Sequence, residues 1–302
     1  FPTPDGSAVV TRSLLLLDDR QDILGNQFEA LWTANTGPLQ HRLVTGFELA
    51  RYEDIYSLDV ALLPVIDLFN PVEFATDPPP VIPGLSSNGD SRSQILAPYL
   101  IDEISVSDRW RFLVGARYDE IDFDDKVSQT SRSHGKLSPL LGGVFEATSN
   151  LHLYANFAQS FAPPSPRVTG EALPEESQQI ELGARQELMD GRMKLTAAAY
   201  EIERENIAIP DDNSFTQQVG DQRSRGLELE VAMELVDGLH GLLVYGYTDS
   251  VLTRFTESVL VALDPPTYMT IDRSGNQAAF APEHLARCLL YTSDAADDSI
   301  RV

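Results

Sequence analysis

The sequence predicts an all-β fold, an antiparallel up-and-down transmembrane β-barrel. Apolar and polar residues alternate with a period of two along many segments, which places them on opposite faces of a strand. These segments mostly run 10–14 residues, and a tilted strand needs roughly 9–11 residues to cross a bilayer. Short connections alternate with long ones, as in membrane barrels whose two rims carry tight turns and long loops.

Twelve strands follow from this alternation. It is clearest in 110–120, 150–160 and 223–235, each of which has one apolar face and one mostly polar face. In chain order, the predicted strands lie near 8–17, 23–34, 39–52, 93–106, 110–123, 136–147, 151–162, 178–188, 192–204, 223–235, 239–252 and 278–287.

The connections between these strands fall into two classes. Turn-forming Gly, Asn, Asp and Ser residues occupy the short class, near 35–38, 107–109, 148–150, 189–191 and 236–238. The long class is predicted near 53–92, 124–135, 163–177, 205–222 and 253–277. Because the long connections lie within one regular meander, we expect a single domain. A large soluble β-protein would show the same alternation and is an alternative at this point.

Composition and motifs exclude several classes of protein. The 22 Lys and Arg residues against 46 Asp and Glu give a net charge of −24, which disfavours a general nucleic-acid binder. No apolar run approaches the ~18 residues of a membrane helix. A single Cys excludes a disulfide framework or a Cys-based zinc cluster. No hydrolase, zinc-protease or nucleotide-binding motif occurs and the five His residues are scattered, so we expect no enzyme, catalytic residue, cofactor or metal site.

A set of short motifs recurs at the expected strand positions. Gly-Ala-Arg-Tyr-Asp stands at 115–119, Glu-Leu-Gly-Ala-Arg at 181–185 and Arg-Gly-Leu-Glu at 225–228. Further matching segments lie at 36–41, 137–142, 153–163, 173–177 and 200–207. In their order and spacing over about 35–287, these segments resemble TonB-dependent outer-membrane receptors, most of all the ferric-siderophore branch.

The resemblance implies a 22-stranded barrel in a Gram-negative outer membrane, of which this chain would supply about twelve strands. Family members carry an N-terminal plug domain and an energy-coupling segment, the TonB box, and we expect this chain to lack both. The implied function is energy-coupled import of a ferric siderophore. The implied partners are the metal chelate, a TonB-type periplasmic coupling protein acting through the absent N-terminal segment, and outer-membrane lipid and lipopolysaccharide. We expect a monomer, and we expect the open arc not to fold stably by itself because its two edges are unpaired.

The last fifteen residues break the pattern. Residues 288–298 resemble a translated sequencing adapter, so we expect 1–287 to be the receptor barrel portion and 288–302 not to be native. The chain would then be cut at its C-terminus and also at its N-terminus. A natural strand end followed by a polar tail is the alternative.

Candidate site residues follow from the strand faces and from the resemblance. Barrel glutamates that latch plug arginines are implied at Glu181 and Glu228. Ligand contacts are expected from aromatic residues of the long loops, which could instead pack loop against loop. The lumen-facing candidates are Arg111, Arg117, Asp119, Arg185, Glu230 and Glu234, although any of them could be plain hydrophilic lining. The ligand-loop candidates are Tyr56, Phe69, Phe74, Phe215, Phe255 and Tyr268.

Other functions are compatible with parts of this pattern. A receptor of the same family could take cobalamin, haem, another metal chelate or a glycan. A passive outer-membrane porin would share the alternation but would have no plug, and a soluble β-adhesin would have no lipid-facing surface.

Overall fold

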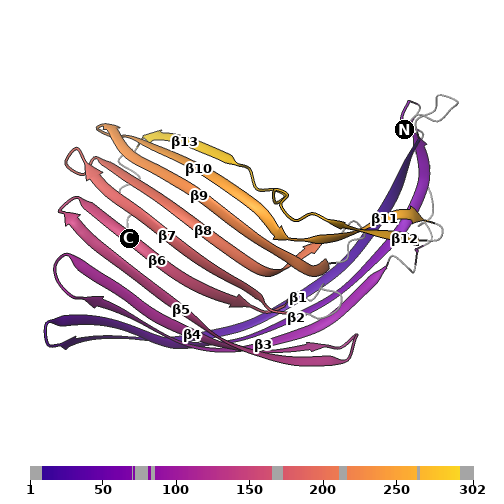
Figure 1. Cartoon of the computed structure of the whole chain (residues 1–302), viewed down its shortest axis with the longest axis horizontal. Helices are drawn as coiled ribbons and strands as arrows, with labels where there is room; N and C mark the ends of the chain where they lie inside the picture. The colour runs from indigo at the N-terminus through magenta and orange to yellow at the C-terminus, as the bar shows by residue number, and fades with distance from the viewer. Residues whose placement is uncertain are drawn as a thin grey trace.

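The computed structural model describes residues 9–69, 71, 81–82, 86–164, 173–210, 216–263 and 266–292. These residues form thirteen β-strands, and no helix among them is long and apolar enough to cross a membrane (Figure 1). The strands are β1 (Val9–Thr36), β2 (Leu39–Asp67), β3 (Ser87–Ser105), β4 (Trp110–Asp125), β5 (Thr130–Thr148), β6 (Leu151–Ala162), β7 (Glu175–Leu188), β8 (Met193–Pro210), β9 (Thr216–Val236), β10 (Leu239–Arg254), β11 (Thr256–Leu263), β12 (Pro266–Asp272) and β13 (His284–Thr292).

Eleven strands make one antiparallel sheet in the order β1 to β10 and then β13. Each strand pairs with the next one along the chain, which confirms the predicted all-β meander. The sheet is rolled into an open trough, with the tight turns at one end and the hairpin β11–β12 at the other (Figure 1). β1 and β13 are its edges and do not pair with each other, so the barrel is not closed.

Several of the predicted loops are strands. β1 has 28 residues and β2 has 29, far more than the roughly 9–11 that a bilayer requires. β2 runs through 53–67, and the predicted loop 124–135 is reduced to a short turn between Asp125 and Thr130. The loop predicted at 205–222 is also mostly strand. Polar residues signalled loops in 124–135 and 205–222, but a strand that continues beyond the lipid can carry polar residues on both faces. Residues 58–66 are mostly apolar and form strand without a period of two.

The two strands predicted at 8–17 and 23–34 are one continuous strand. The polar run 18–22 suggested a turn, but each of its residues pairs with β2. Gln21 donates a hydrogen bond to Asp54 on β2, at 2.7 Å, and Arg20 forms an ion pair with Asp22. These polar contacts let the ladder pass through a segment that has no apolar face.

Residues 253–277 contain a hairpin that the sequence did not predict. β11 pairs with β12 from Thr256↔Asp272 to Leu263↔Pro266, as a separate two-stranded sheet. The last predicted strand, 278–287, is shifted to β13, which pairs with β10. β13 includes residues 288–292, whereas 293–302 lie outside the described residues. This pairing does not test whether 288–302 is native, so that assignment stays a prediction.

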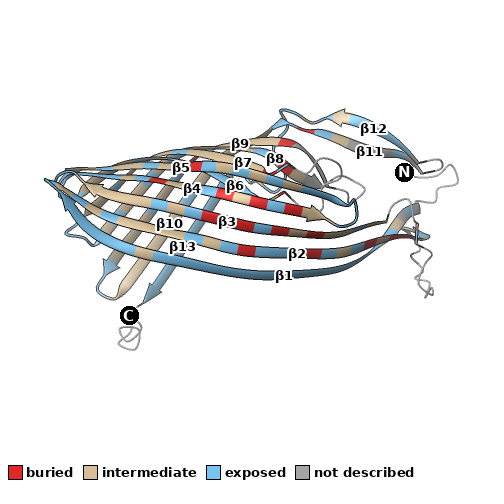
Figure 2. Ribbon diagram, turned by 90° about the horizontal axis from the view of Figure 1, so that it is seen from below, coloured by how far each residue is buried: buried red, intermediate tan, exposed pale blue. Residues whose placement is uncertain are grey.

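The polar face of the sheet is its concave face. Arg117 on β4 reaches Glu48 on β2 at 2.8 Å, and Tyr200 on β8 reaches Thr248 on β10 at 3.0 Å. These contacts cross one intervening strand, and a rolled sheet brings such side chains together on its inner face (Figure 1). Buried positions form bands along β2, β3 and β4, away from the tight turns (Figure 2).

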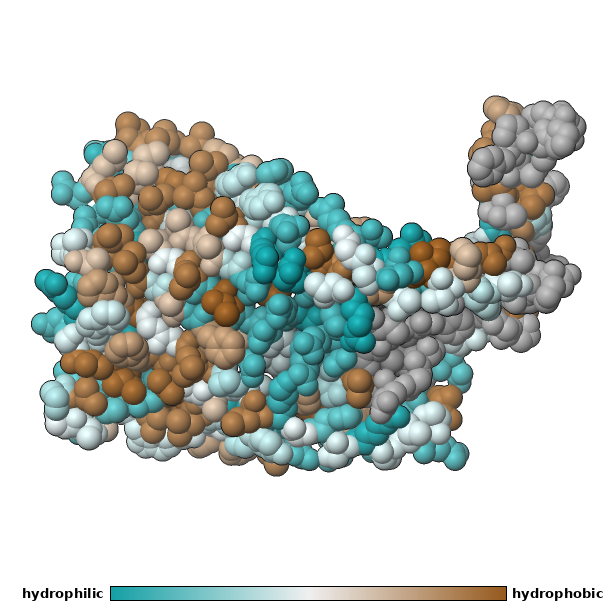
Figure 3. Space-filling model, viewed as in Figure 1, coloured by the Kyte–Doolittle hydropathy of each residue, from teal (hydrophilic) through white to brown (hydrophobic). Residues whose placement is uncertain are grey.

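The convex face is mostly apolar near the tight turns, and by register it also carries His41 and Asp102, whose side chains are hydrogen-bonded at 2.7 Å. In Figure 3, apolar residues gather toward that end of the molecule and polar residues cross its middle. The two tryptophans, Trp32 and Trp110, are about half exposed there and belong to the convex face by register. Tryptophan prefers the interface between lipid and water, which agrees with a bilayer edge close to the tight turns.

Three tyrosines on the concave face each cover a glycine directly across the ladder. Tyr154 is paired with Gly183, Tyr99 with Gly46, and Tyr200 with Gly226. A Cβ atom added to Gly183 would collide with the Tyr154 ring. The rings fill the space that the glycines leave, a device that shields a glycine within a strand.

A test of this packing is the substitution Gly183→Val in a complete barrel. The new side chain would displace the Tyr154 ring, and we expect the barrel to lose roughly 1–3 kcal/mol of stability. The loss is measured as a lower unfolding temperature in the heat-dependent mobility shift of the barrel on SDS–PAGE. The control is Gly246→Val, in the same row of the sheet, because Gly246 has open space around it. Equal losses in the two variants would contradict the account.

Candidate functional site

The concave face carries two polar clusters. In the first, Tyr99 donates a hydrogen bond to Glu29, at 2.6 Å, and Gln27 donates to both. Arg117 donates to Glu48 and to Asp119, each at 2.8 Å. These residues come from four successive strands, β1 to β4, so the cluster ties that wall of the trough together.

Asp119 is the most buried acid of the first cluster, with 3 % of its surface exposed. Its charge is compensated by Arg117, the arginine of the Gly-Ala-Arg-Tyr-Asp motif. The motif thus places one cation among the acids Glu48 and Asp119. A buried carboxylate of this kind is tolerated because it is paired and hydrogen-bonded.

The second cluster brings together the two predicted plug-contact residues. Tyr154 donates a hydrogen bond to Glu181, at 2.8 Å, and Gln179 donates to the second oxygen of that carboxylate, at 2.9 Å. Glu228 lies in the row of Tyr154, three strands away, with Gly183 and Ala198 between them.

The second cluster has a surplus of negative charge. In the part of the chain that the structure describes, neither Glu181 nor Glu228 forms an ion pair with a Lys, Arg or His. Glu181 thus contacts the tyrosine, Glu228 lies in the same row three strands away, and both acids are on the concave face. Such an arrangement suits a cationic group supplied from outside these strands.

The remaining lumen candidates lie on the same concave face by register. Arg111 lies an even number of residues from Arg117 on β4, so both point to the same face. The same spacing relates Arg185 to Glu181 on β7. Glu230 and Glu234 share the parity of Glu228 on β9. Arg111, Arg185 and Glu230 are exposed, and no role beyond polar lining follows from their contacts.

The ligand-loop candidates are scattered rather than gathered. Phe69 is 79 % exposed just past β2, and Tyr268 is 44 % exposed on β12. Tyr56 lies within β2 and covers Gly89, so it is a strand residue rather than a loop residue. Phe255 is 8 % exposed where β10 meets β11, which makes it a packing residue. Phe74 and Phe215 lie outside the described residues.

The sequence did not predict which residues hydrogen-bond to the candidate lumen and plug-contact side chains. Tyr154, Tyr99 and Glu48 hold the acids and Arg117 in place, but each reads as ordinary strand sequence. The cross-strand pairing of a tyrosine with a glycine was the available signal, and it requires the register of two strands. No group of three or more His, Cys, Asp or Glu side chains among the described residues is arranged to hold a metal ion.

Ion pairs link neighbouring strands at the ends away from the tight turns. Arg254, the last residue of β10, binds Asp221 of β9 through two nitrogens at 2.8 and 2.9 Å. The Arg254 guanidinium holds the pKa of Asp221 below its usual value, with help from the backbone N–H of Asn206. A carboxylate with a lowered pKa stabilises the fold above the pKa of the unfolded chain, and the contribution is lost as the pH falls through the folded pKa.

We therefore predict that this contact persists at pH 5 and is lost only below about pH 4, the ordinary pKa of an aspartate. Arg254→Gln should speed amide hydrogen exchange in 216–224 at pH 7 by at most about fivefold, since exposed pairs contribute little. Amide exchange rates in 216–224, measured from pH 3 to pH 7 and corrected for the pH dependence of exchange in an unfolded peptide, test both expectations. A variant with unchanged exchange and an unchanged acid transition would contradict it.

Comparisons with known proteins identify the fold and its family. The family model described as "TonB dependent receptor-like, beta-barrel" matches residues 3–297. The chain belongs to the TonB-dependent receptor family. Barrels of this family lie in outer membranes, and its named relatives are receptors rather than enzymes.

Two relatives show the range of similarity. The chain is 29 % identical over 248 residues to the metal-pseudopaline receptor of Pseudomonas aeruginosa, covering 76 % of this chain and 34 % of that receptor. It is 28 % identical over 278 residues to the ferrioxamine B receptor of Salmonella typhimurium, covering 88 % and 36 %. The chain thus spans about a third of the length of these relatives.

Solved structures support the fold. The siderophore receptor PiuA of Acinetobacter baumannii superposes with a TM-score of 0.68 at 22 % identity, over 91 % of this chain and 44 % of that one. The ferric-catecholate import receptor Fiu of E. coli gives 0.67 at 19 % identity, over 92 % and 43 %. The open trough is therefore an arc of a receptor barrel.

Proposed function

We propose that the complete receptor containing this chain imports a ferric siderophore across the outer membrane of a Gram-negative bacterium. The observation that carries the proposal is the family match over almost the whole chain, together with relatives that are receptors for ferrioxamine B, pyoverdine and catecholate siderophores. Transport of this kind is conformational, and it draws its energy from a TonB-type coupling protein in the periplasm.

The chelate would be recognised at the rim opposite the tight turns. Exposed aromatic rings there, Phe69 and Tyr268, offer flat surfaces on which a chelate can stack. β1 and β2 extend well beyond the bilayer at this rim, so part of the rim is a continuation of the sheet. A same-family ligand such as cobalamin, haem or a glycan, and passive diffusion through a porin, are the alternatives.

The second polar cluster would hold the plug. Glu181 at Tyr154 and Glu228 in the same row have no ion pair of their own among the described residues, and a plug arginine would complete the cluster. Arginine is suited to this because its planar guanidinium can bind two carboxylates at once. Removing one member of a buried charged pair costs roughly 3–5 kcal/mol, which is enough to loosen a docked domain.

We predict that Glu181→Ala or Glu228→Ala in the complete receptor opens a leak around the plug. The expected results are greater sensitivity to large antibiotics that the outer membrane excludes, and lower siderophore uptake. The control is Glu187→Gln, which removes a half-buried carboxylate near the tight turns whose ion-pair partner among the described residues is Lys194, at 3.8 Å. Unchanged antibiotic exclusion and unchanged transport in both alanine variants would refute the latch.

Transport itself is tested by expressing the complete receptor in a strain that lacks its own siderophore receptors. Under iron limitation, we expect uptake of radioactive iron presented as ferrioxamine B, pyoverdine or a catecholate chelate, and loss of that uptake in a strain without TonB. Uptake that does not depend on TonB would indicate a porin. TonB-dependent uptake of cobalamin or haem alone would be consistent with the family assignment but would reject a ferric siderophore as the ligand.

A further inference from the structure

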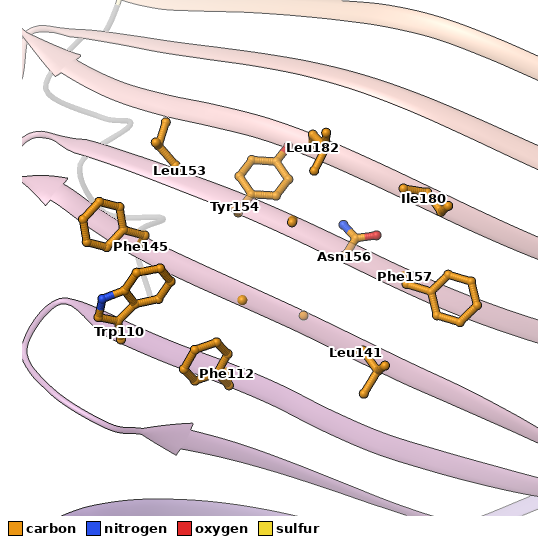
Figure 4. A pocket seen from close by; sticks show the side chains of 13 residues that line it. Trp110, Phe112, Leu141, Phe145, Leu153, Tyr154, Asn156, Phe157, Ile180 and Leu182 are labelled. Carbon is orange, nitrogen blue, oxygen red and sulfur yellow. The ribbon is translucent and has the colours of Figure 1, made fainter.

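The three tyrosines that cover glycines on the concave face send their hydroxyl groups to different partners. The Tyr200 hydroxyl lies 3.0 Å from the hydroxyl of Thr248, and that of a second tyrosine donates to an acid of the first cluster. In Figure 4, the Tyr154 side chain extends from β6 toward β7, where its hydroxyl donates a hydrogen bond to Glu181 at 2.8 Å. Of the three, only Tyr154 holds a plug-contact candidate.

The Glu-x-Gly spacing on β7 brings the acid and the tyrosine together. Glu181 and Gly183 are two residues apart on one strand, so both lie on the concave face. Tyr154 is paired with Gly183, and a Cβ atom at that glycine would collide with the ring and with the hydroxyl. The glycine therefore lets the ring lie flat against β7, and the flat ring carries its hydroxyl to the acid.

Both oxygens of the Glu181 carboxylate are held by neutral donors. Tyr154 donates to Oε1 at 2.8 Å, and Gln179 donates to Oε2 at 2.9 Å. A carboxylate oxygen has more than one lone pair, so each oxygen can accept a further hydrogen bond. The carboxylate thus keeps its charge and offers two adjacent acceptors, which is the arrangement that a planar guanidinium binds.

The tyrosine is the more rigid of the two donors. Its ring is packed over Gly183 and has few rotatable bonds. Gln179 has a longer and more flexible side chain, which loses more freedom when it is ordered. The position of the Tyr154 hydroxyl therefore determines where the Glu181 carboxylate is held.

Glu228 provides the comparison within the same cluster. It also lies two residues from a glycine that a tyrosine covers, since Tyr200 is paired with Gly226. The hydroxyl of that tyrosine is bonded to Thr248 instead. Among the residues that the structure describes, the Glu228 carboxylate has no hydrogen-bond donor. Glu181 is thus the held acid of the two.

We propose that Tyr154 is a positioning residue for the plug contact, because its hydroxyl holds the Glu181 carboxylate in place for a cationic side chain of the plug. The inference rests on the proposed plug contact and adds the residue through which Glu181 acts. Without the hydroxyl, the plug must order the glutamate side chain when it docks. Ordering one flexible side chain weakens binding by about two- to tenfold.

The substitution Tyr154→Phe tests the hydroxyl alone, because a phenylalanine ring still covers Gly183. In the complete receptor, plug release is measured as channel opening in planar bilayers at rising urea concentration. Barrel stability is measured as the unfolding temperature on SDS–PAGE. We expect the equilibrium constant for plug release to rise about two- to tenfold, and the unfolding temperature to stay unchanged. Tyr200→Phe is the matched control over Gly226, and it should leave plug release unchanged.

A double variant tests whether Tyr154 acts through Glu181. In a Glu181→Gln receptor, the carboxylate that the hydroxyl holds is absent, so adding Tyr154→Phe should have no further effect on plug release. Residues that act as one unit show this kind of non-additivity in a double-mutant cycle.

Three results would overturn the proposal. Equal effects of Tyr154→Phe in the wild-type and Glu181→Gln receptors would show that the tyrosine acts independently of the acid. A lower unfolding temperature that accounts for the plug release would assign the hydroxyl to barrel stability. If Glu181→Ala loosens the plug and Tyr154→Phe does not, the positioning role fails and the plug contact stands. If neither variant loosens the plug, both proposals fail together.

Discussion

The rest of the structure depends on the hydrogen-bonded register between neighbouring antiparallel strands. Within lipid, each backbone N–H and C=O must find its partner in the next strand, because no water is present to replace it. Once the register is set, the period of two assigns every side chain to the convex or the concave face. The apolar Leu153 and Ala155 on the convex face of β6 and the acid cluster around Tyr154 on its concave face are consequences of the same register.

The two faces of the sheet differ in the polarity of their side chains. The convex face is mostly apolar, and a described polar pair on it near the tight turns, His41 and Asp102, is hydrogen-bonded. The concave face carries charged residues, and several of them are paired. Arg117 donates hydrogen bonds to Glu48 and Asp119, and tyrosines such as Tyr99 donate to further acids. Glu181 is hydrogen-bonded to Tyr154 and Glu228 lies in the same row of the sheet, and neither is neutralised by a described residue. The unneutralised negative charge suits a cationic partner that binds inside the trough.

Much of this could be predicted from the sequence, and the errors share one cause. Alternation located most of the sheet, and the tight turns located one rim. The polar run 18–22 and the predicted loops at 53–67 and 205–222 were misassigned because alternation vanishes where strands leave the lipid, although hydrogen bonding continues. The acids of the second cluster came from the family motifs. The contact of Glu181 with Tyr154 could not be found, since it depends on which residue of β6 lies opposite Gly183.

The central claim is that register alone divides this chain between lipid and lumen. Spin labels placed one at a time along 227–234 of β9 in the complete receptor, reconstituted in phospholipid, test it most directly. Collision with dissolved oxygen, which concentrates in lipid, should be high at Leu227, Leu229 and Val231 and low at Glu228, Glu230 and Glu234. Uniform collision along the strand, or high values at the glutamates, would contradict the assignment of faces on which the account rests.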